Sequence, residues 1–304
     1  MSNKVIVIGG SGFLGSHVAD ALSESGFDVK IFDKVHSPYL RTDQRMIVGD
    51  IQNFDEMRNA IRGSHYVYHF AGIADIQEAQ ENPIATVKSN ILATAYILDA
   101  CREFKVKRFV YASSIYVYSD QGSFYRSTKQ ASELLIENYH EIFQLDFTIL
   151  RFGSLYGRRA NDFNFIYHAI RQALLEGKIT REGSGEEIRD YMNVLDAARA
   201  SVVVLDDHHK NAYVMIAGTQ TMRVKDLLLM IKEMFNNAVE IDFVEAKKEG
   251  HYEITPYSFK PRVGKKLILN SHYDLGQGIL DTIYDTFKRL TKEGLKIKLE
   301  SLLK

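Results

Sequence analysis

The chain has 304 residues, of which 45% are hydrophobic and 25% charged, and its formal net charge is −1 at pH 7. This length allows one large domain, or a domain with a smaller lobe. A near-neutral charge argues against nucleic acid or a membrane surface as a partner, since either usually requires a basic excess. Any phosphate-bearing ligand must then be bound by a few well-placed amides and arginines.

Cys101 is the only cysteine, so an intrachain disulfide is impossible and a reducing compartment is expected. Its helical surroundings predict a half-buried core thiol, with a catalytic thiol as the less favoured alternative. The N-terminus runs directly into the apolar residues 5–8 without a charged leader. No apolar run approaches the ~20 residues of a membrane span. We therefore expect a cytoplasmic protein without membrane contact.

Short β-branched apolar runs alternate with longer helical patterns over the first half of the chain. The pattern predicts strands at residues 5–8, 29–32, 46–48, 66–70, 109–112 and 148–152. It predicts helices at residues 13–25, 83–104 and 125–143, and Asn53-Phe54-Asp55-Glu56 has the pattern of a capping box before another helix. Such alternation indicates a mainly parallel sheet with helices on both faces.

The regular alternation of strands and helices ends after Tyr156-Gly157. Helical segments near residues 165–176 and 224–236 are there separated by loops and isolated strands such as residues 212–216. We therefore predict an α/β fold in two parts. Residues 1–157 form a doubly wound parallel sheet that later segments complete, and residues 158–304 form mainly a smaller C-terminal α/β substrate lobe.

A glycine-rich turn follows the first predicted strand. Gly9 lets the chain turn, Gly12 lets the backbone approach a pyrophosphate, and Gly15 lets helix and sheet pack closely. Phe13 and Leu14 belong to the same turn, and the phosphates would lie on the helix N-terminus. A tight structural turn is the alternative, but the position between a strand and an amphipathic helix favours a dinucleotide. The sequence thus predicts the cofactor-binding turn of a Rossmann fold.

Acidic residues follow the next two strands. Asp33 ends the second strand, where a carboxylate would bind the adenosine ribose hydroxyls and repel a 2′-phosphate. The predicted cofactor is therefore NAD rather than NADP, although Lys34 follows directly. Asp50 and Ile51, after the third strand, are predicted to clamp the adenine, with a turn before a helix as the alternative.

Tyr125 and Lys129 are four residues apart, which places them on one face of a helix. A tyrosine can accept a hydroxyl proton when a nearby ammonium lowers its pKa. The same spacing recurs at Tyr284 and Lys288, which we assign to a solvated helix face. Tyr125 differs because it opens the helix after the strand that ends in Ser113-Ser114. Ligands bind at the carboxyl ends of strands in such a sheet, so Ser114, Tyr125 and Lys129 are predicted to meet there.

At these residues the chain resembles the extended short-chain dehydrogenases/reductases that act on nucleotide sugars, the group that includes UDP-glucose 4-epimerase. The matching pieces occur in family order over about two-thirds of the chain. They are Gly9 to Gly15, Asp33, Asp50-Ile51, His69-Phe70-Ala71-Gly72, Asn90, Ser113-Ser114, Tyr125 with Lys129, Arg151 to Gly157, and Arg189-Asp190.

The resemblance implies a role for each residue. Tyr125 would be the catalytic base, Lys129 would assist it and bind the nicotinamide ribose, and Ser114 would hold the reacting oxygen. Further residues would line the cofactor or the substrate: Ala71, Gly72, Asn90 and Ser113 the cofactor, and Ser154, Asn164 and Arg189 the substrate. Arg189 matches the family arginine that binds the diphosphate. A guanidinium can bind phosphate oxygens through two hydrogen bonds at once. A surface ion pair is its alternative role.

The residues after Ser114 bear on the reaction. Family dehydratases carry an acidic pair and decarboxylases a glutamate in this stretch, whereas Ile115 and Tyr116 stand here and cannot perform acid–base elimination. Epimerisation at C4 through a 4-keto intermediate is therefore predicted. The segment 119–124 is shorter than in relatives, Ser154 replaces an asparagine, and Arg158 replaces a proline. These departures keep a net 4-dehydrogenase or 4-ketoreductase open, and an NAD-binding regulator without turnover is the third alternative.

No set of cysteines, histidines and carboxylates has metal-ligand spacing, so we expect no metal. Packing or solvation accounts for His65, His69, His208 and His209. The resemblance implies a homodimer through the helices at residues 83–104 and 125–143, in carbohydrate biosynthesis.

Overall fold

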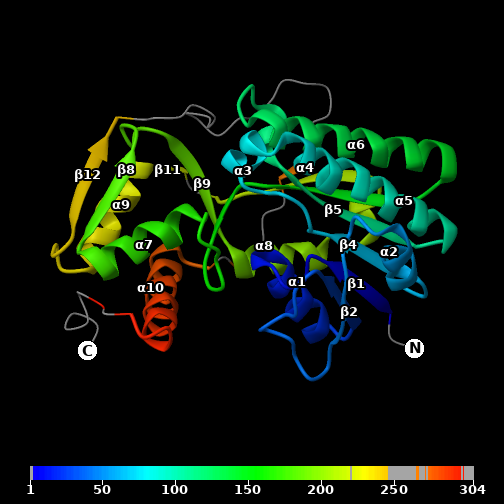
Figure 1. Cartoon of the computed structure of the whole chain (residues 1–304), viewed down its shortest axis with the longest axis horizontal. Helices are drawn as coiled ribbons and strands as arrows, with labels where there is room; N and C mark the ends of the chain where they lie inside the picture. Colours follow the sequence, from blue (N-terminus) through cyan, green and yellow to red (C-terminus); the bar gives the residue numbers. More distant parts are fainter. Residues whose placement is uncertain are drawn as a thin grey trace. The chain divides into compact units, whose positions relative to one another are not determined.

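The computed structural model of the chain describes residues 3–219, 221–245, 265–266, 271, 273–295 and 297. The chain forms two compact units (Figure 1). Unit 1 comprises Met1–Phe152, Ala197–Ile216 and Pro256–Ile268, and unit 2 comprises Gly153–Asp196, Ala217–Thr255 and Leu269–Lys304. The first stretch of unit 1 thus ends at Phe152, before residue 157. Two later segments also belong to unit 1, because each contributes a strand to its sheet.

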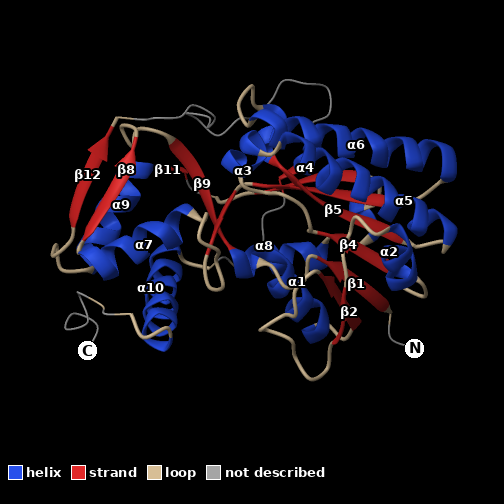
Figure 2. Ribbon diagram, viewed as in Figure 1, coloured by secondary structure: helices blue, strands red, loops and turns tan. Residues whose placement is uncertain are grey.

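Unit 1 is built on an eight-stranded sheet in which every strand is parallel to its neighbours (Figure 2). The order across the sheet is β13-β10-β6-β5-β4-β1-β2-β3. The strands are β1 (Lys4–Ile8), β2 (Asp28–Asp33), β3 (Arg45–Val48), β4 (Tyr66–His69), β5 (Arg108–Ser114), β6 (Phe147–Phe152), β10 (Ala212–Ile216) and β13 (Lys265–Lys266). The strand order reverses direction between β1 and β4, so the predicted doubly wound Rossmann sheet is confirmed. Ligands bind at such a reversal, beyond the carboxyl ends of the strands.

Helices cover both faces of this sheet. They are α1 (Phe13–Glu24), α2 (Phe54–Ile61), α3 (Ile76–Glu81), α4 (Pro83–Val87), α5 (Ala93–Glu103), α6 (Ser123–Phe143) and α8 (Val194–Val203), with short 3₁₀ turns η2 (Ile115–Tyr118) and η3 (Asp207–His209). Consecutive residues of β4 identify the two faces, since side chains of a strand alternate. Tyr68 donates to the carbonyl of Ser201 on α8, whereas His69 contacts Thr94 on α5.

The core between the sheet and helices α2, α5 and α6 is apolar. Ile6 and Ile8 of β1 lie there with Met57 of α2 and Cys101 of α5, all fully buried. Cys101 is therefore a core thiol, as predicted, but it is fully rather than half buried, and burial raises its pKa. The predicted capping box is present only in part. Asn53 accepts from the Glu56 amide and donates to its carboxylate through the side chain, but the backbone amide of Asn53 donates to the Asp50 carbonyl instead of to Glu56.

The predicted helix over residues 83–104 is helical throughout but changes type in the middle. A π-helical turn, η1 (Lys88–Leu92), separates α4 from α5. Helical periodicity in the sequence does not register the one extra residue that widens such a turn. Asn90 lies in the wide turn with its side chain buried.

The described part of unit 2 combines small sheets with helices. Its strands are β7 (Ser154–Tyr156), β8 (Lys178–Glu182), β9 (Ile188–Asn193), β11 (Thr221–Arg223) and β12 (Glu240–Val244), and they pair as β11-β9-β7 and β12-β8. The helices are α7 (Phe165–Glu176), α9 (Val224–Met234) and α10 (Leu275–Lys292). Their apolar faces form one core that includes Ile170, Leu228 and Ile283. Parts of the predicted lobe, such as residues 246–264, lie outside the described residues.

Among the helices in the described part of the chain, none combines the length and the apolar character that a membrane crossing requires.

Candidate active site

The turn between β1 and α1 contains the three predicted glycines, each in a different environment. Gly9 has φ 86°, and a Cβ there would lie 2.5 Å from the amide nitrogen of Ala71. A Cβ on Gly15 would lie 2.1 Å from the Gly9 carbonyl oxygen, so only glycine lets α1 pack this close to the turn. A Cβ on Gly12, by contrast, would meet only that same oxygen, at 3.3 Å. The exposed backbone at Gly12 is open to a ligand.

The N-terminus of α1 favours an anion. Gly12 is the N-cap and supplies no capping side chain, and the first turn carries no acidic residue. Amides at such a helix end, here those of Phe13 and Leu14, attract phosphate oxygens. The turn therefore fits a dinucleotide pyrophosphate.

Asp33 lies beside the glycine turn at the end of β2. Its carboxylate accepts from the amide of Ser11 at 2.9 Å and from that of Val35 at 3.3 Å. A carboxylate has about four lone-pair positions, so two amides leave capacity for further donors. Asp33 is half-buried, and this donor and acceptor set fits an adenosine ribose with free hydroxyls.

The loop after β4 runs against the same turn. The amides of Phe70 and Ala71 both donate to the carbonyl of Ile8, at 2.8 and 3.1 Å. Gly72 has φ 142°, a backbone conformation that favours glycine. The predicted residues Ala71 and Gly72 therefore lie next to Gly9 at the point where the strand order reverses.

Asn90, in the π-helical turn, hydrogen-bonds to the backbone of this loop. Its Oδ1 accepts from the Ile73 amide at 2.8 Å, and its Nδ2 donates to the Ile73 carbonyl and to Thr128 Oγ1, both at 3.0 Å. These contacts join the loop to α6. The predicted contact of Asn90 with the cofactor stays a prediction.

Asp50 and Ile51 form the turn between β3 and α2. Asp50 is exposed, and its Oδ1 accepts from the amide of Gln52 at 2.9 Å. Its own amide donates to Glu56 at 2.9 Å. Ile51 packs against the unit 1 core. The observed contacts are those of a turn before a helix, the alternative considered for Asp50, and an adenine contact stays a prediction.

Ser113 and Ser114 end β5 with different partners. Ser113 is buried, and its hydroxyl donates to Glu133 Oε1 at 2.5 Å. Ser114 Oγ accepts from the amide of Tyr116 at 3.3 Å and caps η2. The structure thus directs Ser113 into the protein interior and places Ser114 at the carboxyl end of the strand.

Tyr125 and Lys129 lie one turn apart on α6. The Lys129 ammonium donates to the Ala112 carbonyl at 2.7 Å and lies 5.8 Å from the centroid of the Tyr125 ring. Burial lowers the pKa of Lys129 to about 8, although the carboxylate of Glu133 acts in the opposite direction. The predicted pair therefore combines a half-buried phenol with a buried ammonium that titrates close to neutral pH.

The short segment 119–124 forms a tight turn before Tyr125. Gly122 has φ 99°, and a Cβ there would lie 2.7 Å from the ring of Tyr116. Arg126 donates to the carbonyl of Ser119 at 2.9 Å and closes the turn from α6. The rings of Tyr116 and Tyr125 meet edge to face with centroids 6.0 Å apart. Dehydratases of the family carry an acidic residue at the position of Tyr116. Here the Tyr116 ring packs against the ring of Tyr125.

The three predicted substrate residues lie in unit 2. Ser154 is the first residue of β7, and Arg189 belongs to the neighbouring strand β9, where it is buried and donates to the Ile188 carbonyl at 3.0 Å. Asn164 is the N-cap of α7. Its Oδ1 accepts from the Tyr167 amide and its Nδ2 donates to the Leu155 carbonyl. Asn164 thus joins α7 to β7, and a substrate contact stays a prediction.

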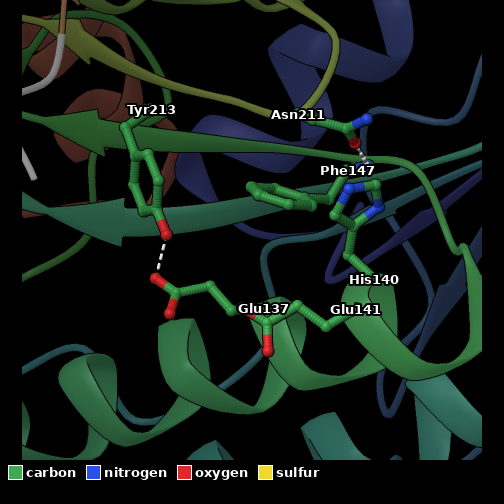
Figure 3. Close-up of a pocket in the computed structure, with 6 residues that line it drawn as sticks. All are labelled: Glu137, His140, Glu141, Phe147, Asn211 and Tyr213. Carbon is green, nitrogen blue, oxygen red and sulfur yellow. Dashed lines mark hydrogen bonds between the residues drawn. The ribbon is translucent and has the colours of Figure 1, made fainter.

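Sequence reasoning did not single out a buried pair behind the catalytic candidates. Glu133, one turn after Lys129 on α6, binds Arg151 of β6 through both carboxylate oxygens. One turn further, Glu137 accepts from Tyr213 of β10 (Figure 3). Spacing was an available signal, because Tyr125, Lys129, Glu133 and Glu137 repeat every fourth residue and so share one helix face.

The remaining sequence predictions concern groups outside this site. Tyr284 is 56% exposed on α10, which confirms a solvated helix face. His69 is buried, and burial lowers its pKa to about 3, so it stays neutral against Thr94. The described residues contain no group of three or more histidines, cysteines or carboxylates arranged to hold a metal.

Comparison with known proteins finds relatives of this chain and a solved structure with the same fold. A putative UDP-glucose 4-epimerase of Methanocaldococcus jannaschii is 28% identical over 75% of this chain and 81% of its own. A UDP-N-acetyl-alpha-D-glucosaminuronate decarboxylase of Bacillus cytotoxicus is 25% identical over 93% and 97%. The solved UDP-glucose 4-epimerase of Thermotoga maritima has the same fold, with a TM-score of 0.83, 23% identity, and coverage of 94% and 99%.

The family model described as the NAD dependent epimerase/dehydratase family matches residues 5–216, which include the glycine turn, Asp33 and the Tyr125–Lys129 pair. The family model matches more than half of the chain, and the glycine turn with Asp33 fits NAD. Together they identify both the family and the cofactor. The chain belongs to the NAD dependent epimerase/dehydratase family, as an NAD-dependent enzyme of the extended short-chain dehydrogenase/reductase type.

Proposed function

We propose that the enzyme oxidises and re-reduces the C4 hydroxyl of a nucleotide-diphosphate sugar and so inverts C4 through a 4-keto intermediate, in carbohydrate biosynthesis. The observation that carries this proposal is the ammonium of Lys129 beneath the Tyr125 ring, on the helix that follows the Ser113-Ser114 strand end. Both curated relatives named above act on UDP-sugars by their printed names.

The proposed cofactor contacts follow from the geometry of unit 1. The amides of Phe13 and Leu14 would bind the pyrophosphate beside the exposed backbone of Gly12, and Asp33 would accept from the adenosine ribose hydroxyls. A carboxylate at that position repels a 2′-phosphate, which favours NAD over NADP. Ala71, Gly72 and Ser113 are proposed to line the nicotinamide side. When bound, NAD supplies the acceptor and later the donor of a hydride.

Tyr125 would take the proton of the sugar hydroxyl. The buried positive charge of Lys129 stabilises the phenolate that this step requires, and a low pKa keeps the ammonium in balance with its neutral form near pH 8. Ser114 would hold the reacting oxygen. In the return step, Tyr125 gives its proton to the oxygen of the ketone as the hydride adds to the opposite face of C4.

The diphosphate of the sugar nucleotide is assigned to unit 2. Arg189 offers a guanidinium that can bind two phosphate oxygens at once. Ser154, on the strand beside β9, is assigned to the same ligand. Asn164 is assigned to the same ligand, and its side chain also caps α7.

Elimination and decarboxylation are disfavoured by the residues after Ser114. Ile115 is buried and Tyr116 packs on Tyr125, so neither provides a carboxylate beside the sugar. The decarboxylase relative therefore supports the substrate class here rather than the reaction.

A net 4-dehydrogenase or 4-ketoreductase is the second candidate. The closed turn at residues 119–124 favours it, because this segment is short where relatives extend beside the sugar. Epimerisation requires the ketone to rotate in the site and to stay there until it is reduced. A shorter segment 119–124 beside the sugar would leave more room for the ketone to rotate, but it would also ease release of the ketone.

A homodimer is proposed through the helices of residues 83–103 and α6. These helices pack against each other and expose large apolar side chains, including Ile84, Val87, Leu92 and Leu134. Leu134→Lys should convert a dimer to a monomer in analytical ultracentrifugation. An unchanged sedimentation coefficient would contradict this interface.

The deciding experiment incubates the enzyme with a panel of UDP-, GDP-, dTDP- and CDP-sugars. NADH absorbance and product stereochemistry are followed in the same samples. Inversion at C4 without net redox change supports epimerisation, and accumulation of NADH or ketone supports the second candidate. Function that survives Tyr125→Phe would instead support a regulator that binds NAD without turnover.

A further inference from the structure

A buried ion pair lies directly behind the catalytic candidates. Glu133 on α6 and Arg151 on β6 are 6% and 3% exposed. Arg151 Nε lies 3.0 Å from Glu133 Oε1, and Nη2 lies 2.6 Å from Oε2. Two parallel charge-assisted bonds of this kind fix the orientation as well as the distance of the two groups.

Further contacts of the pair reach the elements that carry the active site. Ser113 donates to Glu133 at 2.5 Å, directly before Ser114 on β5. Arg151 Nη1 donates to the hydroxyl of Tyr118, at the end of η2. The guanidinium also lies 4.6 Å from the centroid of the Tyr118 ring. The pair therefore connects α6, β5, β6 and η2.

The pair also bears on the charge around Lys129. Lys129 is faced by Tyr125 and Glu133 on its own helix, by the Tyr111 ring of β5 at 4.8 Å, and by the neutral His69 of β4. Side chains four residues apart on a helix are within reach of each other. Glu133 nevertheless points its oxygens at Arg151 and Ser113, while Lys129 binds the Ala112 carbonyl.

We propose that Glu133 and Arg151 are positioning residues of the active site. They fix the end of β5 at Ser114 relative to the helix that carries Tyr125, and they keep the Glu133 carboxylate bonded to Arg151 and Ser113 rather than to Lys129. The inference rests on the proposed function for the roles of Ser114, Tyr125 and Lys129. The pair itself touches neither sugar nor cofactor in this scheme.

The two charges should affect Tyr125 in opposite directions. While Lys129 stays protonated, Glu133→Gln leaves Arg151 as an uncompensated cation, which favours the Tyr125 phenolate and lowers the pH at which it forms. Arg151→Met frees a carboxylate that can bind Lys129, which disfavours the phenolate and raises that pH. Tyr125 and Glu133 are two turns apart on α6, about 12 Å along the helix axis, so each shift should be below about one pH unit. A merely structural role predicts no such opposition.

The chain offers a direct readout, because it contains no tryptophan. Tyrosinate absorbance of the NAD-saturated protein is titrated for each variant, and the curve of the same variant with Tyr125→Phe is subtracted. The difference reports Tyr125 alone and requires no sugar substrate. Failure of the proposed substrate class would therefore leave this result unaffected.

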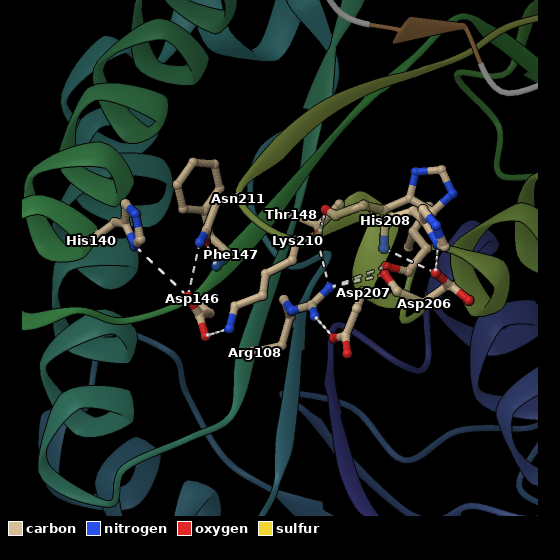
Figure 4. Close-up of polar contacts among 12 residues, drawn as sticks. Arg108, His140, Asp146, Phe147, Thr148, Asp206, Asp207, His208, Lys210 and Asn211 are labelled. Carbon is tan, nitrogen blue, oxygen red and sulfur yellow. Dashed lines mark hydrogen bonds and ion pairs between the residues drawn. The ribbon is translucent and has the colours of Figure 1, made fainter.

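A matched control lies on β5, at the end of the strand opposite Ser113 and Ser114. Arg108, the first residue of β5, is 4% exposed and binds Asp207 of η3 at 3.0 Å (Figure 4). Arg108→Met removes a buried arginine from the same sheet without reaching the Ser114 end. Its thermal stability should fall, while its Tyr125 titration curve should match the wild type.

Opposite shifts for Glu133→Gln and Arg151→Met support the proposal. Shifts of the same sign, or none, would overturn it. If Arg151→Met does not fold, Tyr118→Phe completes the test, because it removes one hydrogen bond of Arg151 but no charge. Glu133→Gln should then lower the titration midpoint and Tyr118→Phe should not, and coincident curves would refute the electrostatic role.

Discussion

Two helices carry a tyrosine four residues before a lysine, and they differ in all that surrounds the pair. On α6, the ammonium of Lys129 is buried, donates to the Ala112 carbonyl and lies 5.8 Å from the Tyr125 ring centroid. On α10, Lys288 lies 4.1 Å from the Tyr284 ring centroid, but both side chains are exposed. The closer pair is thus the solvated one, so proximity alone does not create a catalytic base.

Burial gives the α6 pair its chemistry. Water surrounds the α10 pair and screens its charge, whereas desolvation lowers the pKa of Lys129 to about 8. The α6 pair also follows a strand end in a parallel sheet, the edge at which such folds bind ligands. Each of these differences can be tested by making the same substitution in both helices.

The largest expected effect is on turnover. Tyr125→Phe removes the proposed base and should lower kcat by about 10²- to 10⁴-fold, the usual contribution of general acid–base catalysis. Tyr284→Phe removes the same hydroxyl from the exposed pair and should leave kcat unchanged. Steady-state kinetics on the substrate found in the panel measure both. Equal losses in the two variants would contradict the assignment of Tyr125.

Local signals explain how much of this molecule could be predicted from sequence. The strand runs and the glycine turn are set by neighbours in the chain, so β1 and the Gly9–Gly15 turn were predicted correctly. Helical spacing brought out the Tyr125–Lys129 pair in the same way. The choice of this pair over Tyr284–Lys288 required the further inference that the preceding strand belongs to a parallel sheet.

Features that depend on distant partners were not predicted. The Glu133–Arg151 pair forms because β6 lies beside β5 in the sheet, with Ser113 opposite Arg151 in the register. The π-helical turn at Asn90 likewise depends on a loop seventeen positions away in sequence. Asn164 could not be assigned a role from its residue type, since a side-chain amide can cap a helix or bind a ligand equally well.

A smaller but cleaner effect concerns stability and pH. Lys129→Met should raise the unfolding free energy at pH 7, by at most about 3 kcal/mol, because native Lys129 is held charged in a buried site. Above pH 8 the native lysine loses its proton before the unfolded one does, whose pKa is about 10.5. The unfolded chain then binds more protons, so the wild type gains stability and the advantage of the variant shrinks.

Urea unfolding of both proteins between pH 7 and pH 10 measures this difference. Lys288→Met is the matched control, and the gap between it and the wild type should not change with pH, because Lys288 is exposed. A constant gap for Lys129→Met would show that burial does not set the charge of Lys129.

The smallest expected effect tests the ring that supports Tyr125. Tyr116→Leu keeps an apolar side chain but removes the edge-to-face contact with Tyr125. Such contacts contribute about 0.5–1.5 kcal/mol, so kcat should fall by roughly 2- to 10-fold with NAD affinity unchanged. Phe143→Leu removes a ring contact with Tyr139 at the far end of α6 and serves as the control. If both variants lose kcat equally, the effect comes from the stability of the helix; if only Tyr116→Leu does, the orientation of the phenol limits the proton transfer that the exposed α10 pair cannot perform.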